Sequence, residues 1–332
     1  MKKLEDALDS FKDKRILVLG DIILDKFCWG KIEKLNPEQH AAPNVNIESE
    51  TYALGGAANV ANNVASMGGN CRLYGILGKD LYGGKIRELC EMGKISLFSF
   101  YNGNATIMKQ RIMAHGQQIT RLNYGEKNRK EIDEEIKRKL MGELKKEIGE
   151  ADFIILSDYE KGFFSEDLSQ EILNLANSIG VRTLVDSKQG NINFFENCTI
   201  IKSNKHEASA RTGIAYSNGQ EILIELGKKL SEIANSKYAV ITCGEDGAFS
   251  YDRERKESAM IGTKARKIAD VAGAGDTFAA TLTLGLSSGL NIEDASIIAN
   301  YAAGNVVEKQ GVVTTNIDEI RKRIEEDLSI NL

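Results

Sequence analysis

Short apolar runs that lead to a polar residue recur along the chain, with segments of helical spacing between them. The first run, RILVLGD at 15–21, stays apolar until it reaches Gly20 and Asp21. Such a run is typical of a parallel strand that is buried on both faces and presents a polar residue at its carboxyl end. Similar runs occur at 71–77, 153–158, 183–186, 199–204 and 238–244. Helical spacing predicts helices at 57–67, 81–92, 127–149, 219–235 and 275–308.

This alternation predicts an open α/β sheet, in which ligands bind beyond the carboxyl ends of the strands. Two stretches break the alternation. Residues 22–53 contain both prolines and the only tryptophan, and residues 97–124 alternate apolar and polar positions around an Asn102-Gly103 turn. The second stretch is typical of a β-hairpin. We therefore expect the two stretches to form a small sheet that protrudes from the main domain.

Charge and composition restrict the classes of partner. The 332 residues include 43 basic and 48 acidic side chains, a formal net charge of −5, which argues against nucleic acid as the main partner. No apolar run approaches the roughly 20 residues that span a bilayer, so no membrane partner is expected. The five scattered cysteines form no CxxC pair and favour a reducing compartment. We expect a cytoplasmic protein.

The stretch ADVAGAGDTF at 269–278 is the clearest candidate for chemistry. It is not a dinucleotide-binding loop, because that loop would need Gly or Ala where Phe278 stands. The chain also lacks a Walker A loop, because Ile86 follows the Gly84-Lys85 pair where Ser or Thr would be required.

What remains in this stretch is a glycine loop, Gly273-Ala274-Gly275, that opens a predicted helix. The free N–H groups and the dipole of a helix start favour an anion. Asp276, in the first turn, could be an ordinary capping residue. Its glycine context favours a catalytic base instead, which would take a hydroxyl proton while the loop stabilises a phosphoryl group in transfer.

A second cluster consists of Gly55-Gly56, Asn59 one turn into the following helix, and Asp21 at the end of the first strand. The two glycines could be a simple turn. Sugar hydroxyl groups need both donors and acceptors, and an amide together with a carboxylate would supply them.

A third cluster, Asn204 and Glu207, places an amide and a carboxylate on one side of a helix start. This arrangement suits water-mediated magnesium binding. A capping arrangement without a metal is the alternative.

Together these clusters resemble the ribokinase, or PfkB, family of sugar kinases, from about residue 14 to residue 316. Within it, the chain is similar to the D-glycero-β-D-manno-heptose 7-phosphate kinases of ADP-heptose synthesis. That similarity lies in the stretches GDIILDKFCWG (20–30), NPE (36–38), TIMKQR (106–111), QQITRL (117–122), SDYEKG (157–162) and VEKQGVVT (307–314). Ala272, Ser187 and His115-Gly116 depart from the usual Thr, Pro and Arg-Asn.

The resemblance implies a ribokinase-like three-layer α/β/α sandwich with a small protruding β-sheet lid. The core would comprise residues 1–24, 54–96 and 125–332, and the lid residues 25–53 and 97–124. Such lids commonly pair with a second subunit, so a homodimer is expected.

The resemblance also implies roles for individual residues. Asp276 would be the base, and the anion hole would be formed by Gly273, Ala274 and Gly275. The sugar would be held by Asp21, Gly55, Gly56 and Asn59. The ATP site would include Lys188, Asn204, Thr242, Gly244, Gly247, Asn300 and Ala303. Asn204 and Glu207 would position Mg²⁺, and backbone carbonyls near Asp270, Ala272 and Gly311 would bind a monovalent cation such as K⁺.

A sugar phosphate needs cationic donors that a free sugar does not. The candidates for these donors are Lys109, Arg111, Arg121 and Lys161, and Gln118 and Asp158 complete the predicted substrate site.

The first hypothesis is therefore an ATP- and magnesium-dependent kinase that converts heptose 7-phosphate to the 1,7-bisphosphate, a step toward the lipopolysaccharide core. The alternative is a PfkB kinase of another sugar or sugar phosphate, such as fructose or ribose. A third hypothesis is a non-catalytic sugar or nucleotide sensor, which would have no need of the base.

Overall fold

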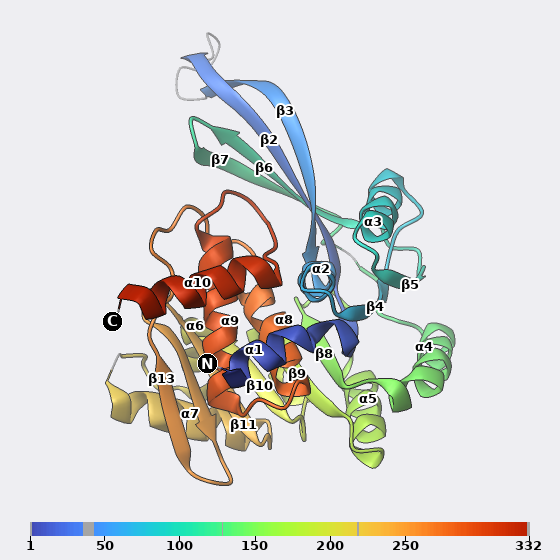
Figure 1. Ribbon diagram of the computed structural model, residues 1–332. Coiled ribbons are helices and arrows are strands. Elements are labelled where there is room, and N and C mark those ends of the chain that lie inside the picture. The colour runs from blue at the N-terminus through green and yellow to red at the C-terminus, as the bar shows by residue number, and fades with distance from the viewer. Residues whose placement is uncertain (1, 36–42, 128, 218, 331–332) are drawn as a thin grey trace.

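The protein contains a large and a small β-sheet, as shown by a computed structural model that describes residues 2–35, 43–127, 129–217 and 219–330 (Figure 1). The large sheet has the strand order β13-β12-β11-β10-β9-β8-β1-β4-β5. In this order, the strands from β11 through β1 to β5 are all parallel to one another. Strands β12 and β13 extend the sheet beyond β11 and pair antiparallel. The bounds are β1 Arg15–Gly20, β4 Asn70–Ile76, β5 Ser96–Phe100, β8 Phe153–Asp158, β9 Arg182–Ser187, β10 Ile200–Asn204, β11 Tyr238–Gly244, β12 Gly247–Asp252 and β13 Glu257–Ile261.

Successive side chains of the central strands enter two different hydrophobic cores. Ile16 and Val18 of β1 belong to the core on one face, and Leu17 and Leu19 belong to the core on the other. Side chains alternate across a strand, so a strand with a core on each face must be apolar at every position. This requirement explains why the predicted buried strands are continuous apolar runs.

Helices cover both faces of the large sheet. One face is covered by α1 Lys2–Asp9, α2 Ala57–Ser66, α3 Leu81–Met92, α8 Ala274–Ser287, α9 Ile292–Val307 and α10 Ile317–Ile330. The other is covered by α4 Glu134–Glu147, α5 Glu166–Ser178, α6 Lys205–Thr212 and α7 Gln220–Ile233, with 3₁₀ turns at Phe11–Asp13, Ile148–Glu150 and Gln189–Phe194. The predicted α/β fold class is confirmed. Among the described residues, none of the helices combines the length and the apolar character needed to cross a membrane.

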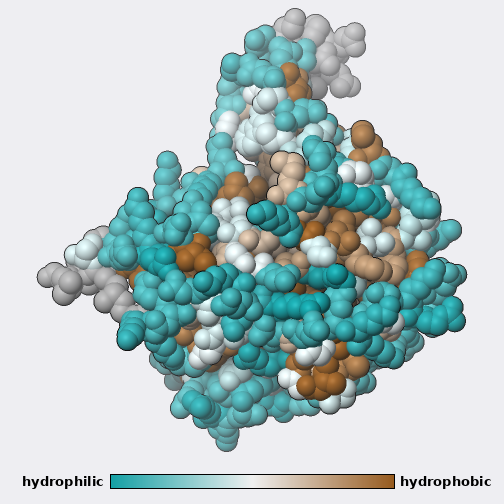
Figure 2. Space-filling model, turned by 45° about the vertical axis from the view of Figure 1, so that its right-hand side comes forward, coloured by the Kyte–Doolittle hydropathy of each residue, from teal (hydrophilic) through white to brown (hydrophobic). Residues whose placement is uncertain are grey.

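The small sheet, which we call the lid, has the strand order β3-β2-β6-β7. Its strands are β2 Ile22–Leu35, β3 Pro43–Gly56, β6 Ile107–Ala114 and β7 Gln117–Tyr124. The lid extends from the body as a narrow arm with a largely hydrophilic surface (Figures 1 and 2). The NPE stretch and the rest of residues 36–42 lie outside the described residues.

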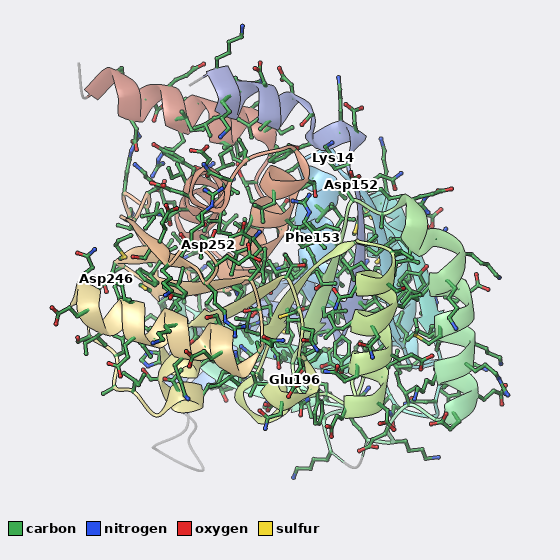
Figure 3. All side chains as sticks on the ribbon, turned by 90° about the horizontal axis from the view of Figure 1, so that it is seen from below. Lys14, Asp152, Phe153, Glu196, Asp246 and Asp252 are labelled. Atoms are coloured by element: carbon green, nitrogen blue, oxygen red, sulfur yellow. The ribbon has the colours of Figure 1, made fainter. Side chains whose placement is uncertain are left out.

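The carboxyl ends of the parallel strands point toward the lid. Figure 3, viewed from the side opposite the lid, shows Lys14, Asp152 and Phe153 together where β1 and β8 begin. Only Asp21 separates β1 from β2, so the chain passes directly from the large sheet into the lid. The edge of the sheet at which an α/β fold is expected to bind ligands therefore lies beneath the lid.

The predicted position of the hairpin turn is wrong. Strand β5 pairs with β4 in the large sheet, and the lid hairpin joins β6 to β7 through His115 and Gly116, both of which have positive φ. Asn102 does not turn a hairpin; its side chain donates to the Lys130 carbonyl oxygen at 3.0 Å. The stretch after β5 thus packs on a distant loop before the chain enters the lid.

Two predicted helices are shorter than expected. The segment 275–308 forms α8 and α9, separated at Gly289, whose φ is +86°, and Asn291 caps the second helix. The segment 127–149 becomes helical only at Glu134, after Asp133 caps it. In both cases a capping residue inside the periodic segment sets the boundary.

Candidate active site

Asp21 lies where β1 passes into β2. Its carboxylate accepts hydrogen bonds from the backbone N–H groups of Tyr159 at 2.8 Å, Lys161 at 3.0 Å and Phe163 at 3.2 Å. Burial and the nearby Asp158 carboxylate raise the pKa of Asp21 to about 6, although the three N–H groups act to lower it. The side chain therefore fixes the loop that follows β8.

Gly55 and Gly56 end β3 at the same junction. A Cβ atom on Gly55 would collide with the carboxylate of Asp25, and one on Gly56 would collide with the carbonyl oxygen of Asp21. Gly56 also has a φ of +58°, in the left-handed region. The glycine pair is required because β3 reaches α2 in close contact with the start of the lid.

Asp276 joins three segments that are distant in the sequence. It lies in the first turn of α8, which follows Gly273 in the left-handed conformation with φ +83°. One carboxylate oxygen accepts from Nδ2 of Asn59 on α2 at 2.7 Å, and the other accepts from the hydroxyl of Tyr159 at 2.7 Å. Asp276 is buried. These two bonds come from outside α8, which distinguishes Asp276 from a simple capping residue.

The surroundings of Asp276 set its acidity. Burial raises the pKa of Asp276 to about 6, and the Asp186 carboxylate adds to this effect. The hydrogen bonds from Asn59 and Tyr159 and the charge of Lys202 act in the opposite direction. A carboxyl group with a pKa near 6 is ionised at neutral pH and is a stronger base than an ordinary aspartate, as proton abstraction requires.

A cavity of about 470 Å³ opens beside Asp276. The predicted residues that line it are Gly273, Ala274, Gly275, Asp276, Lys188, Asn204, Glu207, Thr242, Gly244, Gly247, Asn300 and Ala303. Its wall thus combines the amino end of α8 with the carboxyl ends of β10 and β11. The first N–H groups of a helix have no partner within the helix, so this end of the cavity suits an anion.

Asn204 and Glu207 form a reciprocal cap at the start of α6. The Asn204 side chain accepts from the N–H groups of His206 and Glu207, and the Glu207 carboxylate accepts from the N–H of Asn204 at 3.0 Å. The other Glu207 oxygen pairs with Lys188 at 2.6 Å. Burial acts to raise the pKa of Glu207, but Lys188 and the Asn204 N–H outweigh it and the pKa is lowered.

These contacts limit what the pair can do for a metal ion. The side-chain oxygen of Asn204 already has two donors, so in this conformation it fits contact through metal-bound water and not direct coordination. Each Glu207 oxygen has one donor and keeps a lone pair for a metal ion or its water. Within the described ranges, no group of three or more His, Cys, Asp or Glu side chains could hold a metal ion.

Asp270 ties the glycine loop to the segment after α9. Its carboxylate accepts from the N–H groups of Ala272 at 3.0 Å and Gly311 at 3.1 Å, and its own N–H donates to the Val307 carbonyl oxygen. The three predicted residues of the monovalent-cation site are therefore neighbours. Nothing in the structure explains why position 272 is Ala.

The basic candidates for a substrate phosphate come from the lid and from the loop after β8. Lys109 on β6 has its Nζ atom 5.3 Å from the centroid of the Tyr159 ring. Burial lowers the pKa of Lys109, the positive charges of Lys161 and Arg121 contribute, and the carboxylates of Asp25 and Glu126 act to raise it. Arg111 pairs with Asp25. These side chains lie on the lid side of Tyr159, outside the cavity that α8 lines.

Two predicted substrate residues, Gln118 and Asp158, lie outside the cavity. Gln118 is exposed on β7. Asp158 is buried, and its carboxylate accepts from the Ser187 hydroxyl at 2.9 Å and the Glu160 N–H at 2.9 Å. Ser187, where the family usually has Pro, thus supports Asp158. Neither Gln118 nor Asp158 is among the described residues that line the cavity.

The chain matches the pfkB family carbohydrate kinases over residues 13–319. It belongs to this family. Curated relatives include the bifunctional protein HldE of Sulfurimonas denitrificans, 34% identical over 310 residues, and that of Aliarcobacter butzleri, 36% identical over 311 residues. In both cases the alignment covers 93% of this chain and 64% of the relative. The chain therefore spans less than two thirds of the length of these relatives.

Solved structures of low sequence identity share the fold. Phosphofructokinase-2 from Escherichia coli, in complex with substrates and products, has a TM-score of 0.75 at 18% identity, over 93% of this chain and 97% of that one. Ribokinase from Arabidopsis thaliana, complexed with ribose and ATP, has a TM-score of 0.73 at 17% identity, over 93% and 98%. The pfkB chain described here has a ribokinase-like fold.

The residues that the sequence did not predict include four that bind or pair with charged groups of the site. Tyr159 binds Asp276, Asp25 pairs with Arg111, and Lys202 on β10 pairs with Asp186 on β9 at 2.6 Å. Lys202 was detectable in principle, because a lysine inside the apolar run 199–204 is unusual for a buried strand. Its Nζ atom would lie 3.1 Å from a Cβ atom on Gly275, so glycine there lets the lysine approach α8.

Proposed function

We propose that this chain transfers the γ-phosphoryl group of ATP to the anomeric hydroxyl of D-glycero-D-manno-heptose 7-phosphate, which yields the 1,7-bisphosphate for ADP-heptose synthesis. The membership in the pfkB family and the relatives named bifunctional protein HldE support a sugar kinase. The heptose phosphate is proposed from the sequence stretches described above and from the charges of the site.

One observation carries the choice of a phosphorylated acceptor: basic side chains lie next to the proposed base. The Nζ atom of Lys109 lies over the Tyr159 ring, and the hydroxyl of that ring binds Asp276. Lys161 and Arg121 lie close enough to Lys109 to lower its pKa. Cationic donors of this kind match a phosphate and are unnecessary for a neutral sugar.

The chemical step needs one base and a site for the transferred group. Asp276 accepts the proton of the sugar hydroxyl as the oxygen–phosphorus bond forms and the bond to the ADP leaving group breaks. The N–H groups of Gly273, Gly275 and Asp276 at the start of α8 stabilise the phosphoryl oxygens, whereas the N–H of Ala274 donates to the Val271 carbonyl oxygen. Lys188 lies in the same cavity. Such transfer depends mainly on positioning and on charge stabilisation.

The ions have defined places in this proposal. Mg²⁺, when bound with ATP, would neutralise phosphate charge, and Asn204 and Glu207 would hold its water ligands. We also propose that backbone carbonyls near Asp270, Ala272 and Gly311 bind K⁺; one structure of Escherichia coli phosphofructokinase-2 is in complex with potassium.

We retain a division into core and lid as a proposal, with the β5 residues of the predicted lid moved to the core because β5 pairs with β4 in the large sheet. The homodimer through the lid and the cytoplasmic location also stay proposals. The exposed face of β7 supports the dimer, and the five free, buried cysteines agree with a reducing compartment. Sedimentation velocity would detect the dimer, and a monomer at micromolar concentration would contradict it.

A coupled assay of ADP release tests the function. The panel contains heptose 7-phosphate, the same heptose without its phosphate, fructose 6-phosphate, fructose, ribose and a sample without sugar. We expect the highest kcat/KM for heptose 7-phosphate, and a loss of at least about tenfold when its phosphate is absent, because a hydrogen bond to a charged group contributes about 1.5–3 kcal/mol. A higher kcat/KM for a free hexose or pentose would overturn the heptose assignment.

A pair of variants tests whether the basic side chains select the phosphate. Lys109→Ala should reduce the preference for the phosphorylated heptose. Lys79→Ala is the matched control, because Lys79 also lies over a tyrosine ring, but that ring belongs to Tyr101 and not to Tyr159, the tyrosine that binds Asp276. Ligand binding without ADP release from any sugar would instead favour the sensor.

A further inference from the structure

Tyr159 lies between the two halves of the site, which are the basic side chains of the lid and the cavity beside α8. It is the first residue after β8, and its backbone N–H is held by Asp21 at 2.8 Å. Its ring lines the cavity, and its hydroxyl donates to Asp276 at 2.7 Å. The backbone anchor and the hydroxyl contact together fix the ring at the boundary between the lid and the cavity.

The hydroxyl of Tyr159 acts as a donor at all ordinary pH values. Burial and the carboxylates of Asp276 and Asp186 hold the pKa of Tyr159 well above its usual value. Asp276, when ionised, can only accept. The bond is therefore O–H to carboxylate, a charge-assisted hydrogen bond that favours the ionised form of the base.

Two lysines lie over the same ring. The Nζ atom of Lys109, on lid strand β6, is 5.3 Å from the ring centroid, and the Nζ atom of Lys188, which lines the cavity, is 5.2 Å from it. Ammonium groups at this distance are attracted to the electron-rich face of an aromatic ring. The Tyr159 side chain thus contacts Asp276 through its hydroxyl and two lysines through its ring, one from the lid and one from the cavity.

We propose that Tyr159 is a positioning residue for this kinase: its hydroxyl holds Asp276 ionised and oriented toward the acceptor hydroxyl, while its ring fixes Lys109 and Lys188 on either side of the transfer. The proposal deepens the proposed function and rests on it for the identity of the reaction. Tyr159 itself contacts the base and not, in this geometry, the reacting phosphorus.

Other groups also face Asp276, and the test must separate them from Tyr159. They are Asn59 on α2, Asp186 on β9, Lys202 on β10 and Lys188 after β9. Tyr159→Phe removes only the hydroxyl and keeps the ring, its cation contacts and its backbone anchor. A change in Asp276 in this variant is therefore attributable to the lost hydrogen bond.

The first measurement needs no sugar. The carboxyl ¹³C signal of Asp276, assigned by its loss in Asp276→Asn, is titrated in the wild type and in Tyr159→Phe. We expect the pKa of Asp276 to rise by about one unit in Tyr159→Phe, because a hydrogen bond to a charged group is lost. An unchanged pKa would overturn the proposal.

Tyr301→Phe is the matched control. Tyr301 on α9 also donates to an aspartate, Asp327, at 3.0 Å, and neither residue lines the cavity. This variant should leave the titration of Asp276 unchanged. Equal shifts in both variants would point to a general effect of losing a tyrosine hydroxyl and would count against Tyr159.

The second measurement is the pH dependence of kcat/KM with the best acceptor from the panel. In Tyr159→Phe, the acidic side of the pH profile should shift to higher pH, because Asp276 is protonated more readily. The loss of kcat/KM relative to wild type should then be about fivefold to tenfold greater at pH 5.5 than at pH 8.5. An equal loss at both pH values would indicate a merely structural role. If no sugar supports turnover, the proposed function fails, whereas the titration still decides the role of Tyr159.

Discussion

Each carboxylate oxygen of Asp276 already has one hydrogen-bond donor, Asn59 or Tyr159, and each retains a lone pair for the acceptor hydroxyl. Asp276→Asn keeps the size of the side chain and removes the base. We expect kcat to fall by about 10²–10⁴-fold, the usual contribution of general base catalysis, with ATP affinity almost unchanged. Turnover assays and calorimetric titration with ATP measure the two effects.

Asp252→Asn is the control for this change. Asp252 ends β12, where its carboxylate accepts from the N–H groups of Glu254 and Arg255, away from the cavity. Its kcat should match the wild type. Wild-type turnover in Asp276→Asn would contradict the assignment of the base.

Among single residues, the sequence predicts those that belong to a motif of neighbouring positions. Gly273, Gly275 and Asp276 lie within four positions, so their pattern is legible without a structure. Tyr159 lies 117 positions from Asp276, and its hydroxyl has a role only because β8 and α8 meet beneath the lid. The residue types within SDYEKG indicated a functional stretch, but not which side chain touches the base.

Helix α8 can begin where it does only because Gly273 adopts the left-handed conformation. A Cβ atom there would also lie 2.8 Å from Nδ2 of Asn59, the donor to Asp276. Gly273→Ala should therefore reduce the free energy of unfolding by about 1–2 kcal/mol and lower kcat as well. Chemical denaturation and ADP release measure these changes.

Gly213→Ala separates the two causes. Gly213 follows α6 with a φ of +74°, so it has the same backbone requirement, but nothing lies within 4 Å of an added Cβ atom. It should lose similar stability and keep its activity. Equal activity losses in both variants would mean that the Asn59 contact does not matter for catalysis.

Elements are predictable where the pattern reflects burial. The strands of the large sheet are apolar throughout because cores lie on both faces, and this requirement is visible in the sequence. The place of β5 is not visible, because its short run of alternating residues suits either sheet, and only pairing with β4 decides it. The Asn102-Gly103 dipeptide suits a hairpin, but its contact with Lys130 depends on a loop 28 residues away.

Across the whole molecule, the site depends on the junction of the two sheets. Asp21 connects β1 to the lid, holds the loop that carries Tyr159, and approaches Gly56 through its carbonyl group. The lid, the loop and α8 thus meet around buried carboxyl groups. Those groups are costly to ionise away from water, which links the function of the site to the stability of the fold.

That link gives a pH-dependent prediction. The pKa of Asp276 is about 6 in the folded protein against an ordinary value of 3.8, so the folded state binds this proton more tightly than the unfolded state. The stability from this group is fully present below the ordinary value and is lost as the pH rises through 6. The free energy of unfolding of Asp276→Asn relative to wild type should therefore increase by about 2 kcal/mol from pH 4.5 to pH 7.5. Asp327→Asn should show almost no change over this range, because Tyr301 and Lys264 outweigh burial and lower the pKa of Asp327, so that its contribution is lost only below the ordinary value of 3.8. Urea denaturation at several pH values measures both differences. If the difference between Asp276→Asn and wild type does not change with pH, burial does not raise the pKa of Asp276, and the prediction is wrong.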